Sequence, residues 1–171
     1  MHYLRKEFNQ LVKYAQGLGV KVVFSNKSTN ASADWETDGS TITIYKKKTK
    51  TPLVLNLDLL HELAHHIAWV YKGRKGNLKT NNILDKEAAG KELTELQRKH
   101  IYEDEKFDSQ YQLIIHHEIG SKIPKERVQA EIDLDLWIYK YYWTEGKWPF
   151  LKEIKLKRTE LLKKHRVKHE Q

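Results

Sequence analysis

One predicted helix, over residues 51–71, constrains this chain more than any other segment because it carries two histidines on its apolar side. Thr51 is a suitable N-cap residue, and Pro52 takes the first helical position, where its missing N–H costs nothing. Apolar residues at helical spacing predict one buried face, made of Leu53, Leu57, Leu60, Ala64 and Ala68. His61 and His65 fall along that side, so each imidazole needs a partner in the interior.

The two histidines belong to the sequence His61-Glu62-Leu63-Ala64-His65, which places them at i and i+4, one turn apart on one helix face. Two imidazoles at this spacing can bind one metal ion. The chain contains no cysteine, so thiolate ligands are excluded. We therefore expect a zinc (Zn2+) site at which Glu62 stands beside the open coordination position and acts as the base for an activated water. The alternative is that these are ordinary core or surface histidines.

A third ligand must come from elsewhere in the chain. The extended HExxHxxGxxH pattern is absent, since Ala68 and Tyr71 stand where its glycine and third histidine belong. A glutamate from a later helix is the other common solution. Glu131 lies on a largely apolar face of a predicted helix, with Asp135 four residues further on. We expect Glu131 to bind the metal and Asp135 to orient a ligand histidine. The alternative carboxylate ligands are Glu118, Glu126 and Asp135.

Several other polar residues are candidates for secondary roles. His116 and His117 follow a short apolar run and are candidates for contacting a reaction oxyanion or substrate, or for replacing the glutamate ligand. A structural role, such as capping a helix C-terminus, is commoner for such histidines. Tyr71 is a further candidate oxyanion donor. We expect His66 and His100 to lie at the surface.

Periodicity predicts the remaining secondary structure. Alternating residues predict strands over 20–25 and 41–45, and a third strand around Trp35 precedes the turn dipeptide Asp38-Gly39, so we expect a three-stranded antiparallel sheet. A polar loop is expected over 77–82 and a short apolar run over 111–119. Further helices are expected over residues 3–17, 85–102, 125–143 and 148–165.

These elements predict a single α+β domain over residues 1–171. Within it we expect a helix plus the antiparallel sheet over 1–50, metal-site helices over 51–145 and a basic C-terminal helix over 146–171. No apolar run is long enough to cross a bilayer and no signal peptide is visible, so we expect a soluble, cytoplasmic protein.

The chain is basic, with 31 Lys and Arg against 23 Asp and Glu and a net charge of +8. Much of this excess lies from Lys147 onwards. We expect the C-terminal helix to pack through its apolar side and expose a solvated basic face. The alternative is a surface that contacts DNA, RNA or an acidic protein.

The order of parts, with an N-terminal helix, a small sheet, an HELAHH helix and a downstream acidic helix, resembles that of the ImmA/IrrE-type metallopeptidases. These are compact gluzincin-like proteins of bacteria, phages and mobile elements. The resemblance covers roughly residues 1–145, and its specific part is His61, Glu62, His65 and the region of Glu131. In the family the glutamate is usually followed by alanine, whereas here Ile132 and Asp133 follow it.

This resemblance implies a small zincin-like fold in which two histidines and a downstream glutamate hold zinc and Glu62 is the base. It also implies cleavage of an intracellular regulatory protein, such as a transcriptional regulator. Zincin folds place an edge strand beside the metal to pair with extended substrate, and by analogy we expect the strand over 41–45 in that role.

Together these observations predict a zinc-dependent intracellular endopeptidase of the HExxH class. The alternative is a catalytically inactive, zincin-like basic module that contacts a regulator or nucleic acid.

Overall fold

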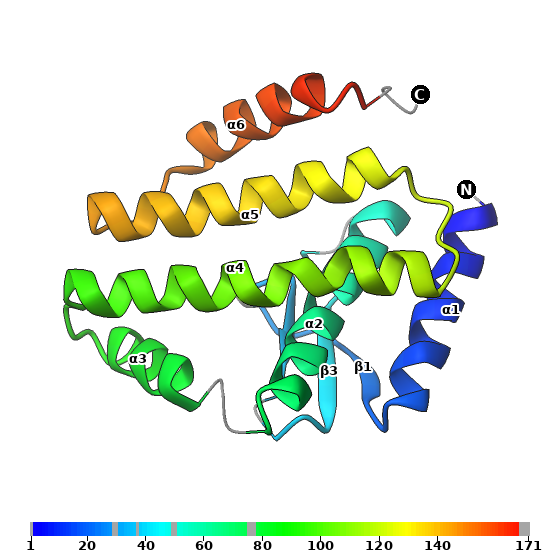
Figure 1. Ribbon diagram of the computed structural model, residues 1–171, viewed down its shortest axis with the longest axis horizontal. Helices are drawn as coiled ribbons and strands as arrows, with labels where there is room; N and C mark the ends of the chain where they lie inside the picture. The colour runs from blue at the N-terminus through cyan, green and yellow to red at the C-terminus, as the bar shows by residue number, and fades with distance from the viewer. Residues whose placement is uncertain (1, 29–30, 37, 49–50, 75–77, 168–171) are drawn as a thin grey trace.

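The computed structural model describes residues 2–28, 31–36, 38–48, 51–74 and 78–167 (Figure 1). The elements are α1 (His2–Gly17), β1 (Lys21–Ser25), β2 (Ala33–Trp35), β3 (Thr41–Tyr45), α2 (Pro52–Tyr71), α3 (Leu78–Ala88), α4 (Glu95–Glu118), α5 (Lys125–Glu145) and α6 (Leu151–Lys164). The expected α+β class is confirmed.

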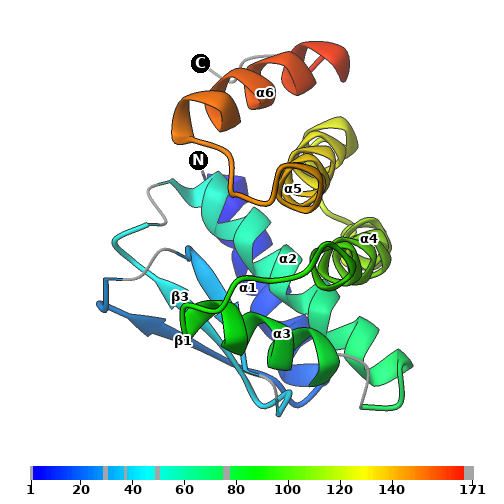
Figure 2. The ribbon, with the colours of Figure 1, turned by 90° about the vertical axis from the view of Figure 1, so that its left-hand side faces the viewer.

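The elements are stacked in layers that begin at the sheet. Helices α1 and α2 pack on the strands, and the other side of α2 packs on α4 (Figure 2). Helix α5 lies along α4 and α6 lies along α5, so the last three long helices run side by side across the molecule. Helix α3 packs against α4. This order places α2 between the sheet and the C-terminal helices.

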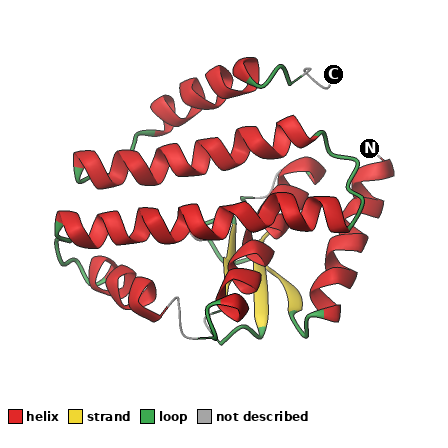
Figure 3. Cartoon of the chain, in the orientation of Figure 1, coloured by secondary structure: helices red, strands yellow, loops and turns green. Residues whose placement is uncertain are grey.

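The strands, yellow in Figure 3, form a mixed sheet, so the expectation of an antiparallel sheet is wrong in part. Its strand order is β1-β3-β2. Strand β2 runs antiparallel to β3 with Trp35 opposite Ile42, as expected for strands joined at Asp38-Gly39. Strand β1 runs parallel to β3, with Val22 opposite Ile42. After β1 the chain continues to the far side of β3, so β1 and β2 never become neighbours.

This topology makes β3 the central strand. Both of its sides pair with neighbouring strands, so the prediction that residues 41–45 form a substrate-binding edge is wrong. In the described part of the chain, β2 pairs with β3 alone, and its outer side is therefore a sheet edge.

Helix α2 begins and ends where its sequence signals place it. The Thr51 hydroxyl accepts a hydrogen bond from the backbone N–H of Val54 at 3.2 Å, and Pro52 is the first helical residue. Its neighbours correct one expectation, because His66 is buried against the rings of Trp35 and Trp69 and does not lie at the surface.

The largest difference from the predicted elements lies in the third and fourth helices. The loop expected over 77–82 is helical from Leu78 onwards, and residue 77 lies outside the described residues. The helix expected over 85–102 is interrupted after Ala88, and α4 starts at Glu95 with a capping box between Thr94 and Gln97. Helix α4 then continues unbroken to Glu118, so it includes the apolar run expected over 111–119 except for its last residue.

The main core lies between the sheet, α1 and α2, and it extends to the ends of α4 and α5. Helix α6 buries fewer side chains, and Leu161 is the buried one among its described residues. Its Leu161 is buried against Ala130 and Leu134 of α5, which confirms packing through an apolar side. Phe150 and Leu151 remain 70% and 76% exposed, respectively. None of the helices described here combines the length and apolarity that a bilayer span requires.

Candidate metal centre

A cleft of about 570 Å3 opens where β2, α2, α3, α4 and α5 meet. Helix α2 contributes His61, Glu62 and His65 to its lining, and α4 contributes Glu105 and Asp108. The strand that borders it is the edge strand β2. The HExxH residues therefore lie at a cleft next to a sheet edge.

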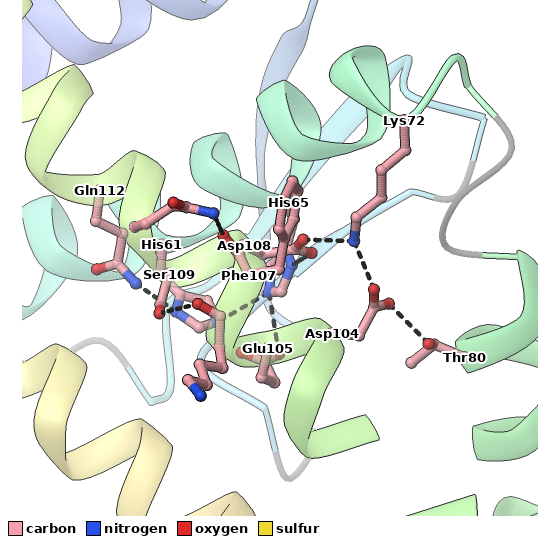
Figure 4. A network of polar contacts seen from close by, with 12 residues as sticks. His61, His65, Lys72, Thr80, Asp104, Glu105, Phe107, Asp108, Ser109 and Gln112 are labelled. Atoms are coloured by element: carbon pink, nitrogen blue, oxygen red, sulfur yellow. Dashed lines mark hydrogen bonds and ion pairs between the residues drawn. The ribbon is translucent and has the colours of Figure 1, made fainter. Parts of the chain in front are cut away.

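Three side chains converge in this cleft on one small volume (Figure 4). The Nε2 atoms of His61 and His65 are 3.0 Å apart, and Nε2 of His65 is 3.3 Å from Oε1 of Glu105. One ligand atom from each of these residues lies within 4.8 Å of the others. Two imidazole nitrogens and one carboxylate oxygen therefore form a group that can hold a metal ion.

Each imidazole is also held through its second ring nitrogen. Nδ1 of His65 lies 2.8 Å from Oδ2 of Asp108. Nδ1 of His61 lies 3.1 Å from the side-chain nitrogen of Gln112 and 3.5 Å from Oδ2 of Asp135. These contacts hold both rings with Nε2 toward the cluster. The carboxylate at Nδ1 of His65 is the partner typical of a ligand histidine, whereas the amide nitrogen of Gln112 donates to Nδ1 of His61. Asp135 thus lies where it can orient His61, the kind of position expected for it.

Helix α4 supplies Asp108 and Gln112, together with Glu105, from one buried face. The residues of this face follow helical spacing, with apolar side chains at both ends and polar side chains in the middle. In chain order they are Ile101, Glu105, Asp108, Gln112 and Ile115. Lys72 supports this face from the end of α2, with its ammonium 2.7 Å from Oδ1 of Asp108 and 2.5 Å from Asp104. The Thr80 hydroxyl of α3 donates to Asp104 at 2.7 Å.

The acidic residues of the centre differ in their electrostatics. Burial raises the pKa of Glu62 to about 7. Burial also acts to raise the pKa of Glu105, but the neighbouring His65 outweighs it through charge and a hydrogen bond, and the pKa falls to about 2. Glu105 is therefore a permanent anion, whereas Glu62 can exchange a proton near neutral pH.

The two imidazoles differ in the same way. Burial, together with the charge of His65, lowers the pKa of His61 to about 4. Burial acts to lower the pKa of His65 as well, but the carboxylates of Glu105 and Asp108 outweigh it and raise the pKa well above its usual value. The cluster thus retains one positive charge between His65 and its two carboxylate neighbours.

Glu131, the expected third ligand, is engaged elsewhere. It lines the same cleft from α5, but its Oε1 is 2.7 Å from Arg127 and its Oε2 is 3.0 Å from Arg158 of α6. Glu105 is the carboxylate that the structure brings together with the two histidines. The pairing with two guanidinium groups explains why an inward-facing Glu131 does not require a metal.

The remaining candidates lie outside the cleft lining. Tyr71 is 74% exposed and packs against the rings of Phe107 and Tyr111. Nε2 of His116 lies 2.7 Å from the backbone oxygen of Ile123, which is a structural contact. His117 is exposed in the last turn of α4. Of the alternative ligands, Asp135 lines the cleft, but Glu118 accepts a hydrogen bond from the Tyr14 hydroxyl and Glu126 is exposed outside it.

Sequence reasoning missed Glu105 and Asp108 because residues 103–110 were not assigned to a helix, and it missed Gln112 because the run over 111–119 was expected only as an apolar run. Their signal is a helical face that is apolar at both ends and polar in the middle. The capping box at Thr94 marks where that helix begins.

Comparison of the chain with models of protein families, with curated proteins and with solved structures finds no match.

Proposed function

We propose that this chain is a zinc-dependent peptide-bond hydrolase that acts on a regulatory protein, in the manner of the ImmA/IrrE-type metallopeptidases that its sequence resembles. The observation that carries the proposal is the convergence of His61, His65 and Glu105 in a cleft that Glu62 also lines. The three residues come from α2 and α4, which are separated in sequence by α3, and two of them belong to the HExxH pattern.

The donor set fits zinc. Two imidazoles and one carboxylate are ligands that zinc prefers, and three protein ligands leave one position open, as in catalytic sites. Nδ1 of His65 faces a carboxylate and therefore carries a proton, so in the neutral ring Nε2 presents a lone pair toward His61. A metal ion bound by these atoms would take the place of the proton that His65 otherwise carries on Nε2. The anionic Glu105 and Asp108 add the charge that favours a divalent ion.

Zinc in such a site would supply a Lewis acid that polarises a peptide carbonyl and makes water more acidic. The chain's own contribution is the carboxylate of Glu62. This residue is only 8% exposed, and its carboxylate has no hydrogen bond or ion pair with any residue that the structure describes. A carboxylate that lines the cleft beside the two histidines can take a proton from water and pass it to a leaving amine. The backbone of β2 offers N–H and C=O groups at the cleft for pairing with extended substrate.

A second candidate function is a binding module without turnover that contacts a partner through α6. The observation that favours it is the exposure of Phe150 and Leu151 beside the basic residues Lys152 and Lys155. Such a mixed apolar and cationic surface suits an acidic partner.

The test measures zinc content by elemental analysis and cleavage of a random peptide mixture by mass spectrometry, in wild type, Glu62→Gln and His61→Ala. We expect about one zinc per wild-type chain, retained in Glu62→Gln and lost in His61→Ala. Cleavage should occur in wild type alone. Bound zinc without cleavage would favour the binding module, and no zinc after reconstitution would contradict the proposed metal site.

A further inference from the structure

The lining of the cleft is strongly acidic although the chain as a whole carries a net charge of +8. No Lys or Arg is among the described residues that line it. The carboxylates in the lining are those of Asp34, Glu36, Asp58, Glu62, Asp104, Glu105, Asp108, Glu131 and Asp135. The cleft is therefore negatively charged on a positively charged molecule. This negative charge concentrates cations in the cleft and repels polyanions from it.

Most of the deep carboxylates already have cationic or imidazole partners. Lys72 neutralises Asp104 and Asp108, and two arginines neutralise Glu131. The carboxylates at the sheet edge differ. No ion pair in the described chain involves Asp34 or Glu36, and both residues are exposed. Asp34 only accepts a neutral hydrogen bond, from the Tyr45 hydroxyl at 2.7 Å.

A second feature also indicates that the cleft receives a ligand. Glu62 is more than nine-tenths buried and lines the cleft, yet among the described residues its carboxylate has no hydrogen-bond or ion-pair partner. The carboxylate therefore has its free hydrogen-bonding positions toward the cleft, where a group that enters can occupy them.

Asp34 and Glu36 are two residues apart on one strand and its continuation. The backbone N–H of Glu36 donates to the Thr41 carbonyl at 2.8 Å, so the pairing with β3 continues past Trp35. Residues two apart along a strand point to the same side, at a separation of about 7 Å. A polypeptide paired with this edge presents its own alternate side chains at the same separation.

We infer that the substrate of this cleft is an extended, cationic polypeptide segment in which two Lys or Arg residues at positions i and i+2 face Asp34 and Glu36. The inference rests on the proposed function, because it describes the segment that is delivered to the metal centre. Neutral or acidic segments lose these two ion pairs and are bound less well.

The test measures binding of fluorescein-labelled, ten-residue peptides by anisotropy. The protein is zinc-treated Glu62→Gln, a background chosen to prevent cleavage. Three peptides of otherwise identical sequence carry Lys at i and i+2, Lys at i and i+1, or Gln at i and i+2. At about 50 mM salt we expect the first to bind about tenfold more tightly than the third, with the second between them.

The charge contacts are tested by two double variants in that background. Asp34→Asn with Glu36→Gln should reduce the preference for the first peptide to less than about twofold. Glu92→Gln with Glu145→Gln removes the same charge from exposed positions outside the cleft lining and should leave the preference unchanged.

Equal binding of the Lys and Gln peptides, no binding of any peptide, or a preference that survives the Asp34 and Glu36 substitutions would each overturn the inference. Zinc content is measured on the same preparations. A charge preference without zinc would therefore contradict the proposed hydrolase and support the cationic ligand, whereas zinc without a preference would do the reverse.

Discussion

Asp108 contacts His65 with one carboxylate oxygen, Oδ2 lying 2.8 Å from Nδ1, while the other oxygen lies 2.7 Å from the ammonium of Lys72. The aspartate therefore fixes the ring whose Nε2 faces His61 and Glu105 in the candidate metal centre. Asp108→Asn should weaken zinc binding by about 10–100-fold, because it removes the anion that orients and polarises this imidazole. Competition with a chromophoric chelator measures the effect.

Asp104→Asn is the matched control for this prediction. It removes the other carboxylate partner of Lys72 but no contact to an imidazole. Its zinc affinity should stay within about threefold of wild type. Equal losses in both variants would show that Lys72 pairing, and not the contact with His65, is what the site requires.

The identity of the third ligand gives the most direct prediction. Glu105→Gln should lose stoichiometric zinc, because the amide is a poor zinc ligand at the position that converges with the two histidines. Glu131→Gln should retain zinc, since the carboxylate of Glu131 is paired with arginines. The opposite pattern in elemental analysis would make Glu131 the ligand.

Burial of Glu62 predicts a pH dependence of stability in the metal-free protein. Its pKa is raised in the folded state from 4.5 to about 7, so the folded chain binds more protons than the unfolded chain in this window. The free energy of unfolding therefore falls by about 3 kcal/mol at this site as the pH rises from about 4.5 to about 7.

Urea unfolding of wild type and Glu62→Gln, both in chelator, isolates this contribution. The variant should become more stable than wild type as the pH rises, and the difference between them should grow by about 3 kcal/mol up to pH about 8. A constant difference across the range would mean that the Glu62 carboxylate is not desolvated in the folded chain.

Gly39 should be one of the least replaceable residues of the connection between β2 and β3. Its φ is 74°, and a Cβ placed on it would lie 2.5 Å from the ring of Trp69. Gly39→Ala should therefore lower the free energy of unfolding by about 2–4 kcal/mol. Gly90 has a similar φ of 77° with nothing near a Cβ, so Gly90→Ala isolates the backbone cost of about 1 kcal/mol. Equal losses would contradict the predicted clash.

The position of α2 and its histidine pair could be predicted because the signals are local. The Thr51 cap, Pro52 and the apolar spacing all act within the same segment, and i, i+4 geometry follows from the helix itself. The parallel pairing of β1 with β3 could not be predicted in the same way. Alternation identifies strands but not their neighbours, which depend on how α1 and α2 cover the sheet.

The structure brings Glu105, and not the expected Glu131, together with the two histidines for a related reason. Glu131 and Glu105 both face inward, and sequence alone cannot distinguish a carboxylate that meets arginine from one that meets imidazole. The partner Arg158 comes from α6, 27 residues away along the chain. Only the packing of α4 on α2 and of α6 on α5 separates these two environments.

The ligands of the candidate centre come from α2 and α4, which are separated in sequence by α3 and its connections. An ion bound there would act as a noncovalent crosslink between the sheet side of the molecule and its C-terminal helices. If the ion binds only the folded chain, it lowers the population of open forms. The factor is one plus the free ion concentration divided by the dissociation constant. The supply of zinc would then also set the lifetime of the chain, since cellular proteases degrade the open forms.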